Sequence, residues 1–299
     1  MTRHWLILSN FCLAIGLSFS VRLPGQENTP TKPLIHVYFT AENNGKGDSA
    51  PVPTLSDFEM TIDKEPTKAV SIRSASDDKL LFALLVDFSG SGFYEADSIK
   101  KTAMRILQGL LNGKNEGRLV VFNDRVEASK NPIDLPSAEK IMNRTQFYGG
   151  TALYDAISAT CRQLLSKTGN PATPRRAILL LTDGGDNSSS ADMRKATDVA
   201  EREGVAIFSL QIVESKVVSW EEAHHATRLL KELSQSTGGQ TVLPKKIEDG
   251  VEPVLKAIHD QWVLDLEPGQ ALDQNLHPLQ VKSIQKNLQL SVPASIPIP

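Results

Sequence analysis

The sequence contains very little cysteine. Only Cys12 and Cys161 occur among its 299 residues. If residues 1–20 are removed as a signal peptide, Cys161 remains alone and no internal disulfide can form, which excludes a small disulfide-stapled scaffold. Cys161 shares a helical face with Leu153 and Ile157. We therefore interpret it as a small core residue and not as a nucleophile.

An excess of positive charge is also missing. The chain has 32 Lys and Arg against 35 Asp and Glu, for a formal net charge of −3. Aromatic residues make up only 6% of the chain, and they do not alternate with basic residues along a stripe. Nucleic acid is therefore not an expected partner. The sequence gives no reason to expect binding to an anionic membrane surface either.

Long apolar runs are absent after the N-terminus. Spanning a bilayer takes about 17–25 apolar residues, and only the stretch from Trp5 to Phe19 approaches that length. Arg3 and His4 precede this stretch and small residues follow it, so residues 1–20 are expected to be a secretory signal peptide. An uncleaved anchor is the alternative. The protein is expected to be secreted or periplasmic, in the cell envelope, with no membrane span after cleavage.

The sequence lacks the common catalytic motifs. Ser89 and Ser91 do not lie in the G-x-S-x-G spacing of a hydrolase nucleophile, and no histidine is placed to act as their base. A phosphate-binding G-x-x-x-x-G-K-[ST] loop does not occur. The chain is therefore expected not to be an enzyme. A hydrolase that uses the same oxygen-bearing residues remains an alternative.

The sequence does contain enough apolar residues, 40% of the chain, to form a packed core. Its pattern changes from β-like to α/β and back to β-like. The terminal strands are too few to be stable alone, so we expect them to pack together as a small β-sandwich-like unit with the α/β domain inserted. The expected division is a signal peptide at 1–20, a flexible lead-in at 21–32, an N-terminal β segment at 33–77, the α/β domain at 78–261 and a C-terminal β segment at 262–299.

The middle of the chain alternates buried strands with amphipathic helices. The segment from Leu80 to Val86 is almost continuously apolar, which is typical of a strand covered on both faces. This alternation predicts a Rossmann-like, doubly wound, mostly parallel sheet. The expected strands are 34–40, 57–62, 69–72, 80–86, 118–122, 177–181, 205–210, 240–243, 262–266, 279–284 and 288–292, and the expected helices are 99–111, 152–165, 193–203, 221–236 and 247–261.

Oxygen-bearing side chains follow several of these strands. Asp87, Ser89 and Ser91 come directly after one apolar strand, Thr151 precedes a helix, and Asp183 follows another apolar strand. Ligands of an open parallel sheet bind at the carboxyl ends of its strands, so these side chains are expected at one edge. Two carboxylates and three hydroxyls suit a hard divalent cation, Mg²⁺ or Mn²⁺. Since neutral ligands leave the ion's charge poorly offset, an open coordination position would attract a carboxylate from another molecule.

Three segments resemble the von Willebrand factor type A domain. They are the D-x-S-x-S stretch at 87–91, the Gly-Gly-Thr stretch at 149–151 and the Thr-Asp-Gly stretch at 182–184. The resemblance implies a metal-ion-dependent adhesion site in which Ser89, Ser91 and Thr151 bind the cation, Thr151 sometimes through water. Asp87 and Asp183 would act mainly through water. It also implies a protein partner that supplies an Asp or Glu carboxylate.

The flanking β segments are similar to those of secreted bacterial proteins of this family. Two other functions stay open. One is a scaffold whose metal site is vestigial, and the other is a docking module of an ATP-driven machine, which the expected signal peptide disfavours. Asp186 and Asn187 either rim the site or are simply turn residues.

Overall fold

The computed structural model describes residues 34–43, 52–166, 174–212, 220–267 and 275–298. These residues belong to one compact unit, 33–299. The expected signal peptide (1–20) and lead-in (21–32) lie outside the described residues. In the described part of the chain, no helix is both long enough and apolar enough to cross a membrane.

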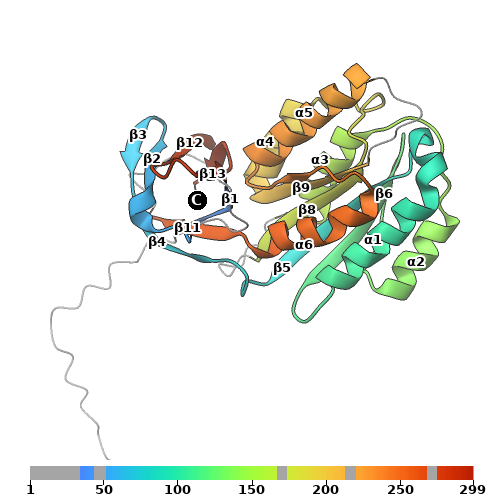
Figure 1. Ribbon diagram of the computed structural model, residues 1–299, viewed down its shortest axis with the longest axis horizontal. Helices are drawn as coiled ribbons and strands as arrows, with labels where there is room; N and C mark the ends of the chain where they lie inside the picture. The colour runs from blue at the N-terminus through green and yellow to red at the C-terminus, as the bar shows by residue number, and fades with distance from the viewer. Residues whose placement is uncertain (1–33, 44–51, 167–173, 213–219, 268–274, 299) are drawn as a thin grey trace, which may run out of the picture. The chain divides into compact units, whose positions relative to one another are not determined.

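A six-stranded sheet forms the centre of the α/β part, in the order β10-β9-β8-β5-β6-β7 (Figure 1). Neighbouring strands are parallel except for β7, which pairs with β6 as an antiparallel hairpin. All residues of β8 and β9 are buried, as expected for strands covered on both faces. The strands are β5 (Leu80–Asp87), β6 (Glu116–Phe122), β7 (Val126–Ala128), β8 (Arg175–Thr182), β9 (Val205–Gln211) and β10 (Thr241–Val242).

Helices cover both faces of this sheet (Figure 1). Helices α1, α2 and α6 pack on one face, and α3, α4 and α5 pack on the other. Helix α1 buries Ile99, Ala103 and Ile106 at helical spacing, which explains its orientation toward the strands. The helices are α1 (Ala96–Leu110), α2 (Leu135–Arg144), α3 (Leu153–Gln163), α4 (Met193–Glu203), α5 (Trp220–Ser236) and α6 (Val251–His259), with short 3₁₀ turns η2 (Gly90–Glu95) and η3 (Ile247–Gly250) before α1 and α6.

Two four-stranded sheets, ordered β13-β1-β11-β4 and β14-β12-β2-β3, make up the β unit. Strands from the two ends of the chain pair directly, β1 with β11 and β2 with β12, both antiparallel. The rings of Phe39 and Phe58 meet edge to face at 5.9 Å in its core. Its elements are β1 (Ile35–Asn43), η1 (Leu55–Asp57), β2 (Phe58–Ile62), β3 (Glu65–Thr67), β4 (Ala69–Ser74), β11 (Trp262–Leu266), β12 (Leu276–Ser283), β13 (Leu288–Ser291) and β14 (Ser295–Pro297).

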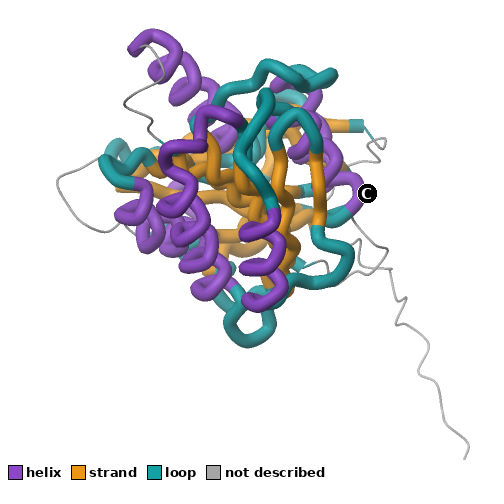
Figure 2. The backbone as a smooth tube through the Cα atoms, turned by 90° about the vertical axis from the view of Figure 1, so that its right-hand side faces the viewer, coloured by secondary structure: helices purple, strands orange, loops and turns teal. Residues whose placement is uncertain are grey.

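The fold class expected from the sequence is confirmed. In the α/β part, a mostly parallel sheet lies between two layers of helices (Figure 2). Separate antiparallel sheets contain strands from both ends of the chain. The entry and exit of this part are held together, because the Ala75 N–H donates to the Gln261 carbonyl at 2.8 Å. Cys161 is fully buried in α3, and burial raises the pKa of its thiol, which confirms its assignment to the core.

Some elements differ from the expectation. The chain forms α2, β3, β7 and β14, none of which was predicted, and the helix expected at 247–261 is divided into η3 and α6. Helix α4 begins and ends at the residues expected from the sequence. Both ends are capped: the Asp192 carboxylate accepts from the Lys195 N–H at the start, and Gly204 takes a left-handed conformation at the end.

Candidate metal centre

Asp87 is the last residue of β5 and is only 3% exposed. One carboxylate oxygen, Oδ1, accepts a hydrogen bond from the Ser89 N–H at 2.9 Å. The other, Oδ2, accepts from the Thr182 hydroxyl at 2.7 Å. The carboxylate is therefore held from both sides, by its own loop and by the end of the neighbouring strand β8.

The two serines connect Asp87's loop to Asp183. The hydroxyls of Ser89 and Ser91 lie 3.1 Å apart, and the Ser91 hydroxyl donates to Oδ2 of Asp183 at 2.8 Å. Oδ1 of Asp183 accepts from the Gly185 N–H at 2.8 Å. Four of the five predicted site residues, Asp87, Ser89, Ser91 and Asp183, thus belong to one continuous hydrogen-bonded cluster at the carboxyl ends of β5 and β8.

Thr151 lies on the neighbouring loop just before α3 and is buried. Its N–H donates to the side-chain oxygen of Asn187 at 2.8 Å, and its carbonyl accepts from the N–H groups of Asn187 and Ser188, both at 3.0 Å. Its hydroxyl has no hydrogen-bond partner in the described part of the chain. The other four site residues make no direct hydrogen bond to Thr151 among the described residues.

Backbone hydrogen bonds nevertheless join the loops that carry these side chains. The Gly90 N–H donates to the Gly149 carbonyl at 3.1 Å, and the Tyr148 N–H donates to the Phe88 carbonyl at 3.0 Å. The loop after β8 is tied to α3, where the Tyr154 N–H donates to the Asp186 carboxylate at 3.1 Å. The three loops therefore form one connected edge of the sheet.

Two glycines permit this close approach. Gly184, directly after Asp183, has a φ of +89°, a conformation that a side chain would strain. A Cβ on Gly150, directly before Thr151, would clash with the side chains of Asn187 and Ser188. Glycine is required at both positions for the loops to lie as they do.

The cluster concentrates negative charge in a buried place. Burial, and secondarily the nearby Asp183 carboxylate, raises the pKa of Asp87, although hydrogen bonds from Ser89 and Thr182 act in the opposite direction. Within the described residues, no Lys, Arg or His forms an ion pair with Asp87 or Asp183. A divalent cation next to both carboxylates would supply the missing opposite charge, so the residues present fit such an ion.

The donor types also restrict the kind of metal. In the described part of the chain, no group of three or more His, Cys, Asp or Glu side chains is arranged to hold a metal ion. The cluster instead offers hydroxyl and carboxylate oxygens, which suit hard cations such as Mg²⁺ and not the softer ions that prefer imidazole and thiolate.

The polar support around the cluster includes residues that the sequence did not reveal. Thr182 bonds Asp87, and the side-chain amide of Gln211 donates to the Asp183 carbonyl at 3.1 Å. The Gln211 oxygen in turn accepts from the Thr227 hydroxyl on α5 at 2.8 Å. Thr182 stands inside the Thr-Asp-Gly stretch, which is the one local signal that could have identified it. Asn187 supports Thr151, whose N–H donates to its side-chain oxygen.

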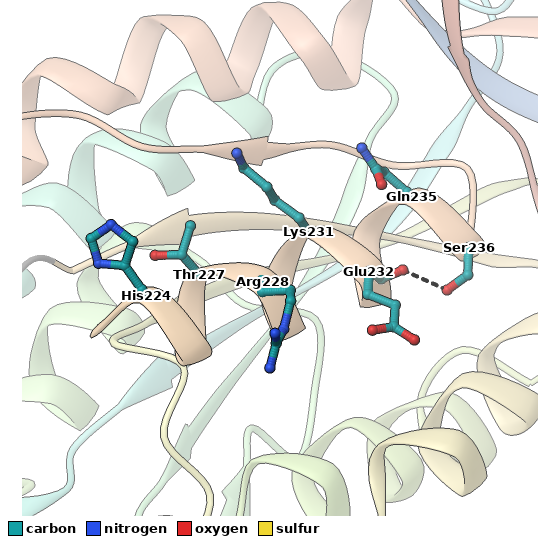
Figure 3. Close-up of a pocket in the computed structure, with 7 residues that line it drawn as sticks. All are labelled: His224, Thr227, Arg228, Lys231, Glu232, Gln235 and Ser236. Atoms are coloured by element: carbon teal, nitrogen blue, oxygen red, sulfur yellow. Dashed lines mark hydrogen bonds between the residues drawn. The ribbon is translucent and has the colours of Figure 1, made fainter. Parts of the chain in front are cut away.

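A hollow of about 720 Å³ lies along the face of α5 that includes Thr227 (Figure 3). All of its lining residues come from this one helix, and the Ser236 hydroxyl bonds the Glu232 carbonyl at 2.8 Å. None of the five predicted site residues lines it. The lining residues are His224, Thr227, Arg228, Lys231, Glu232, Gln235 and Ser236.

The serines have no histidine beside them in the described part of the chain. His36 and His277 each bond an aspartate of the β unit, Asp265 at 2.6 Å and Asp63 at 2.7 Å. The Ser91 hydroxyl instead donates to a carboxylate. The serine hydroxyls are thus bonded to each other and to a carboxylate, and not to the base that a nucleophilic serine needs.

The α/β part of the chain is similar to a known family of domains. Residues 82–255, more than half of the chain, match the family described as von Willebrand factor type A domain. No curated protein matches the chain.

Several solved structures are similar in fold. A von Willebrand factor type A protein from Catenulispora acidiphila is 13% identical, with a TM-score of 0.48, over 90% of this chain and 74% of that one. An aerotolerance-related membrane protein from Bacteroides fragilis is 16% identical, with a TM-score of 0.46, over 60% of this chain and 98% of that one. The protein BatB from Bacteroides thetaiotaomicron is 18% identical, with a TM-score of 0.45, over 60% and 97%.

Proposed function

This chain belongs to the von Willebrand factor type A family, whose domains are protein-interaction modules, and we propose that it binds a partner protein through a divalent cation at the edge of its central sheet. The cation, Mg²⁺ or Mn²⁺, is held by Ser89, Ser91 and Thr151, with Asp87 and Asp183 acting mainly through water. The partner completes the site with an Asp or Glu carboxylate.

One observation carries this proposal. Asp87, Ser89, Ser91 and Asp183 form a single hydrogen-bonded cluster on two adjacent strand ends, with two carboxylates and no basic side chain paired to them in the described residues. The hydroxyl of Thr151, on the loop bonded to theirs, is not engaged by another described residue. A bound cation supplies the positive charge that neutralises the two aspartates and attracts an external carboxylate.

The surface around the cluster supports a protein as the ligand. Phe93 and Tyr94, in the same η2 turn as Ser91, are 62% and 74% exposed, and Tyr148 on the neighbouring loop is 50% exposed. Aromatic side chains are enriched in protein interfaces and often dominate their binding energy. Exposed aromatics beside a cation site are consistent with a partner that covers both.

Cation binding is the first test of this function. We expect the melting temperature of the protein to rise on addition of Mg²⁺ or Mn²⁺ and to return on addition of EDTA, because a ligand that binds only the folded state stabilises it. Ser91→Ala removes one oxygen ligand at a half-buried position. We expect this variant to need about tenfold more cation for the same shift in melting temperature. Ser190→Ala is the matched control, since Ser190 is exposed on the loop between β8 and α4 and only its backbone N–H is hydrogen-bonded, to Asp155.

Asp87→Ala tests the same site at its most buried position, with Ser91→Ala as the variant that is expected to fold normally. If neither cations nor EDTA changes the melting temperature, and both variants behave like the unmodified protein, the cation proposal is wrong and a purely structural domain is the better description. If the protein instead hydrolyses generic esters and Ser89→Ala abolishes the activity, the hydrolase alternative holds.

The proposed location is outside the cytoplasm, secreted or in the periplasm or envelope. This rests on the signal peptide expected at residues 1–20, which the structure does not describe. Cell fractionation with an antibody to the folded part, together with the N-terminal sequence of the isolated protein, would show whether the signal is removed and where the protein resides.

A further inference from the structure

A second hollow, of about 330 Å³, opens beside the cation cluster. Its lining includes Val121 and Phe122 at the end of β6 and Phe88 directly after β5, all of them buried. Its walls come from the β6–β7 hairpin and from the segment 144–148 after α2. The five proposed metal ligands do not line it, so it is a separate feature of the same edge.

The hollow nevertheless starts within one residue of the cation loop. Phe88 stands between Asp87 and Ser89, and its carbonyl accepts from the N–H of Tyr148, which also lines the hollow. Consecutive Cα atoms are about 3.8 Å apart, so an extended chain that crosses from the cation to the hollow needs only a few residues. A single partner segment can therefore occupy both places.

Two arginines face this hollow. Arg125, in the turn between β6 and β7, and Arg144, in the last turn of α2, both line it and are both exposed. Within the described residues, neither guanidinium has a hydrogen bond or an ion pair. The acidic group on the same wall is Glu127, and it is not paired with either arginine. The hollow thus presents two unengaged cationic groups against one acid.

Arginine recognises carboxylates well because its planar guanidinium presents paired N–H donors in a fixed fork. Together with a cation at the neighbouring cluster, the arginines give this edge of the sheet three positive groups. Positive groups arranged in this way match a ligand with more than one negative charge.

We propose that the hollow between the β6–β7 hairpin and segment 144–148 binds a second acidic side chain of the partner. This side chain lies about two to four residues from the carboxylate that completes the cation site, a spacing that an extended segment can provide. The inference deepens the proposed function and rests on it. The partner is thus an acidic segment of a protein, recognised by one cation and by Arg125 and Arg144.

A random dodecapeptide display library is the probe. The full chain is immobilised and the library selected in Mg²⁺ and, separately, in EDTA. The selected peptides are expected to carry two acidic residues at a spacing of about two to four. Their affinity for Arg125→Gln and for Arg144→Gln should fall about three- to fivefold each, and about tenfold for the double variant, by analogy with exposed charge pairs. Replacing the second acidic residue by its amide should have the same effect and should not add to that of the double variant.

Arg202→Gln is the matched control. Arg202 is an exposed arginine in the last turn of a helix, as Arg144 is, but α4 ends at the opposite edge of the sheet. Its replacement is expected to leave peptide binding unchanged, and the melting temperatures of all variants should agree within about 2 °C.

The outcomes separate this inference from the proposed function. If the peptides need Mg²⁺ but bind the double variant and the unmodified protein with equal affinity, the proposed role of the hollow is wrong and the cation site is supported. Peptides that depend on the two arginines but bind equally in EDTA would support the hollow and overturn the cation role. If the unmodified protein selects no peptide under either condition, the inference is wrong.

Discussion

At the scale of single residues, Thr182 is the group on which the position of Asp87 depends. Its hydroxyl is fully buried, donates to the Asp87 carboxylate at 2.7 Å and accepts from the Gly184 N–H at 3.1 Å. This one hydroxyl therefore joins the two aspartate-bearing loops. It also lowers the pKa of Asp87, against the effect of burial.

We expect Thr182→Val to weaken cation binding and to destabilise the fold by about 1–3 kcal/mol. Valine has the shape of threonine but leaves the buried Gly184 N–H and the Asp87 carboxylate without their partner. The measurement is a Mg²⁺ titration of the melting temperature, beside the same titration of Thr182→Ser, which keeps the hydroxyl. Equal cation affinity in the valine variant would show that Asp87 does not need this hydrogen bond.

The placement of Asp87, Ser89, Ser91 and Asp183 at neighbouring strand ends could be predicted from the sequence, because these residues directly follow strands whose apolar character is clear. What Thr182 does was not predictable. Its bond to Asp87 depends on the register of β5 and β8, in which Val86 faces Leu181, and no local pattern reports the pairing of strands 95 positions apart. Arg125 and Arg144 were equally invisible, because only the folded chain brings a hairpin and a helix end to one hollow.

At the scale of elements, the β2–β3 hairpin contains avoidable strain. Its two-residue turn consists of Asp63 and Lys64, with φ of 52° and 71°, while Ile62 pairs with Glu65. Such turns prefer glycine at the second position, because a left-handed conformation is unfavourable for residues with a Cβ.

We expect Lys64→Gly to stabilise the protein by about 0.5–1 kcal/mol. This is the difference between the strain that glycine relieves and the greater conformational entropy that glycine loses on folding. Chemical denaturation measures the change. Lys64→Ala is the control, since it removes the same charge and keeps the strain, and it should leave the stability near that of the unmodified protein. Stabilisation by alanine as large as that by glycine would refute the strain argument.

Two of the unpredicted strands depend on the strand with which they pair and not on a pattern of their own. Strand β14 lies in a proline-rich stretch with no strand-like pattern, and it forms because Ile296 pairs with His277 on β12. Strand β7 has three residues and exists only as the antiparallel partner of β6. The long buried strands needed no such help, because a continuous apolar run specifies its own burial.

At the scale of the whole molecule, the β unit contributes to the environment of the α/β helices. The Thr40 hydroxyl on β1 donates to the Gly239 carbonyl at 3.2 Å, and the Ala294 N–H donates to the Ser236 carbonyl at 2.8 Å. The stretch before β14 also reaches α4, where Glu201 is buried beside Ala294 and Ser295. The stability of the two parts is therefore coupled through this contact.

Glu201 gives this contact a pH dependence. Burial, and then the charge of Asp198, raises its pKa from 4.5 to about 7, although hydrogen bonds from Ser295 and Ala294 oppose the shift. Between these two values the folded state binds a proton that the unfolded state has lost, so stability falls as the pH rises through this range. The destabilisation is absent below the ordinary value and complete above about 7.

Glu201→Gln is therefore expected to flatten the pH dependence of stability. Glutamine cannot ionise, so the variant does not have to bury a charge at pH 8. At pH 5 the glutamate is protonated in the folded state, so glutamine has no such advantage there. We expect the decrease in melting temperature from pH 5 to pH 8 to be smaller in the variant by about 2–4 °C, which corresponds to about 1 kcal/mol for a chain near this size. Glu139→Gln, at an exposed position on α2, should keep the pH dependence of the unmodified protein. If both variants follow the unmodified protein at every pH, Glu201 ionises as easily in the folded chain as in the unfolded one. The contact between α4 and the β14 end would then not depend on its protonation.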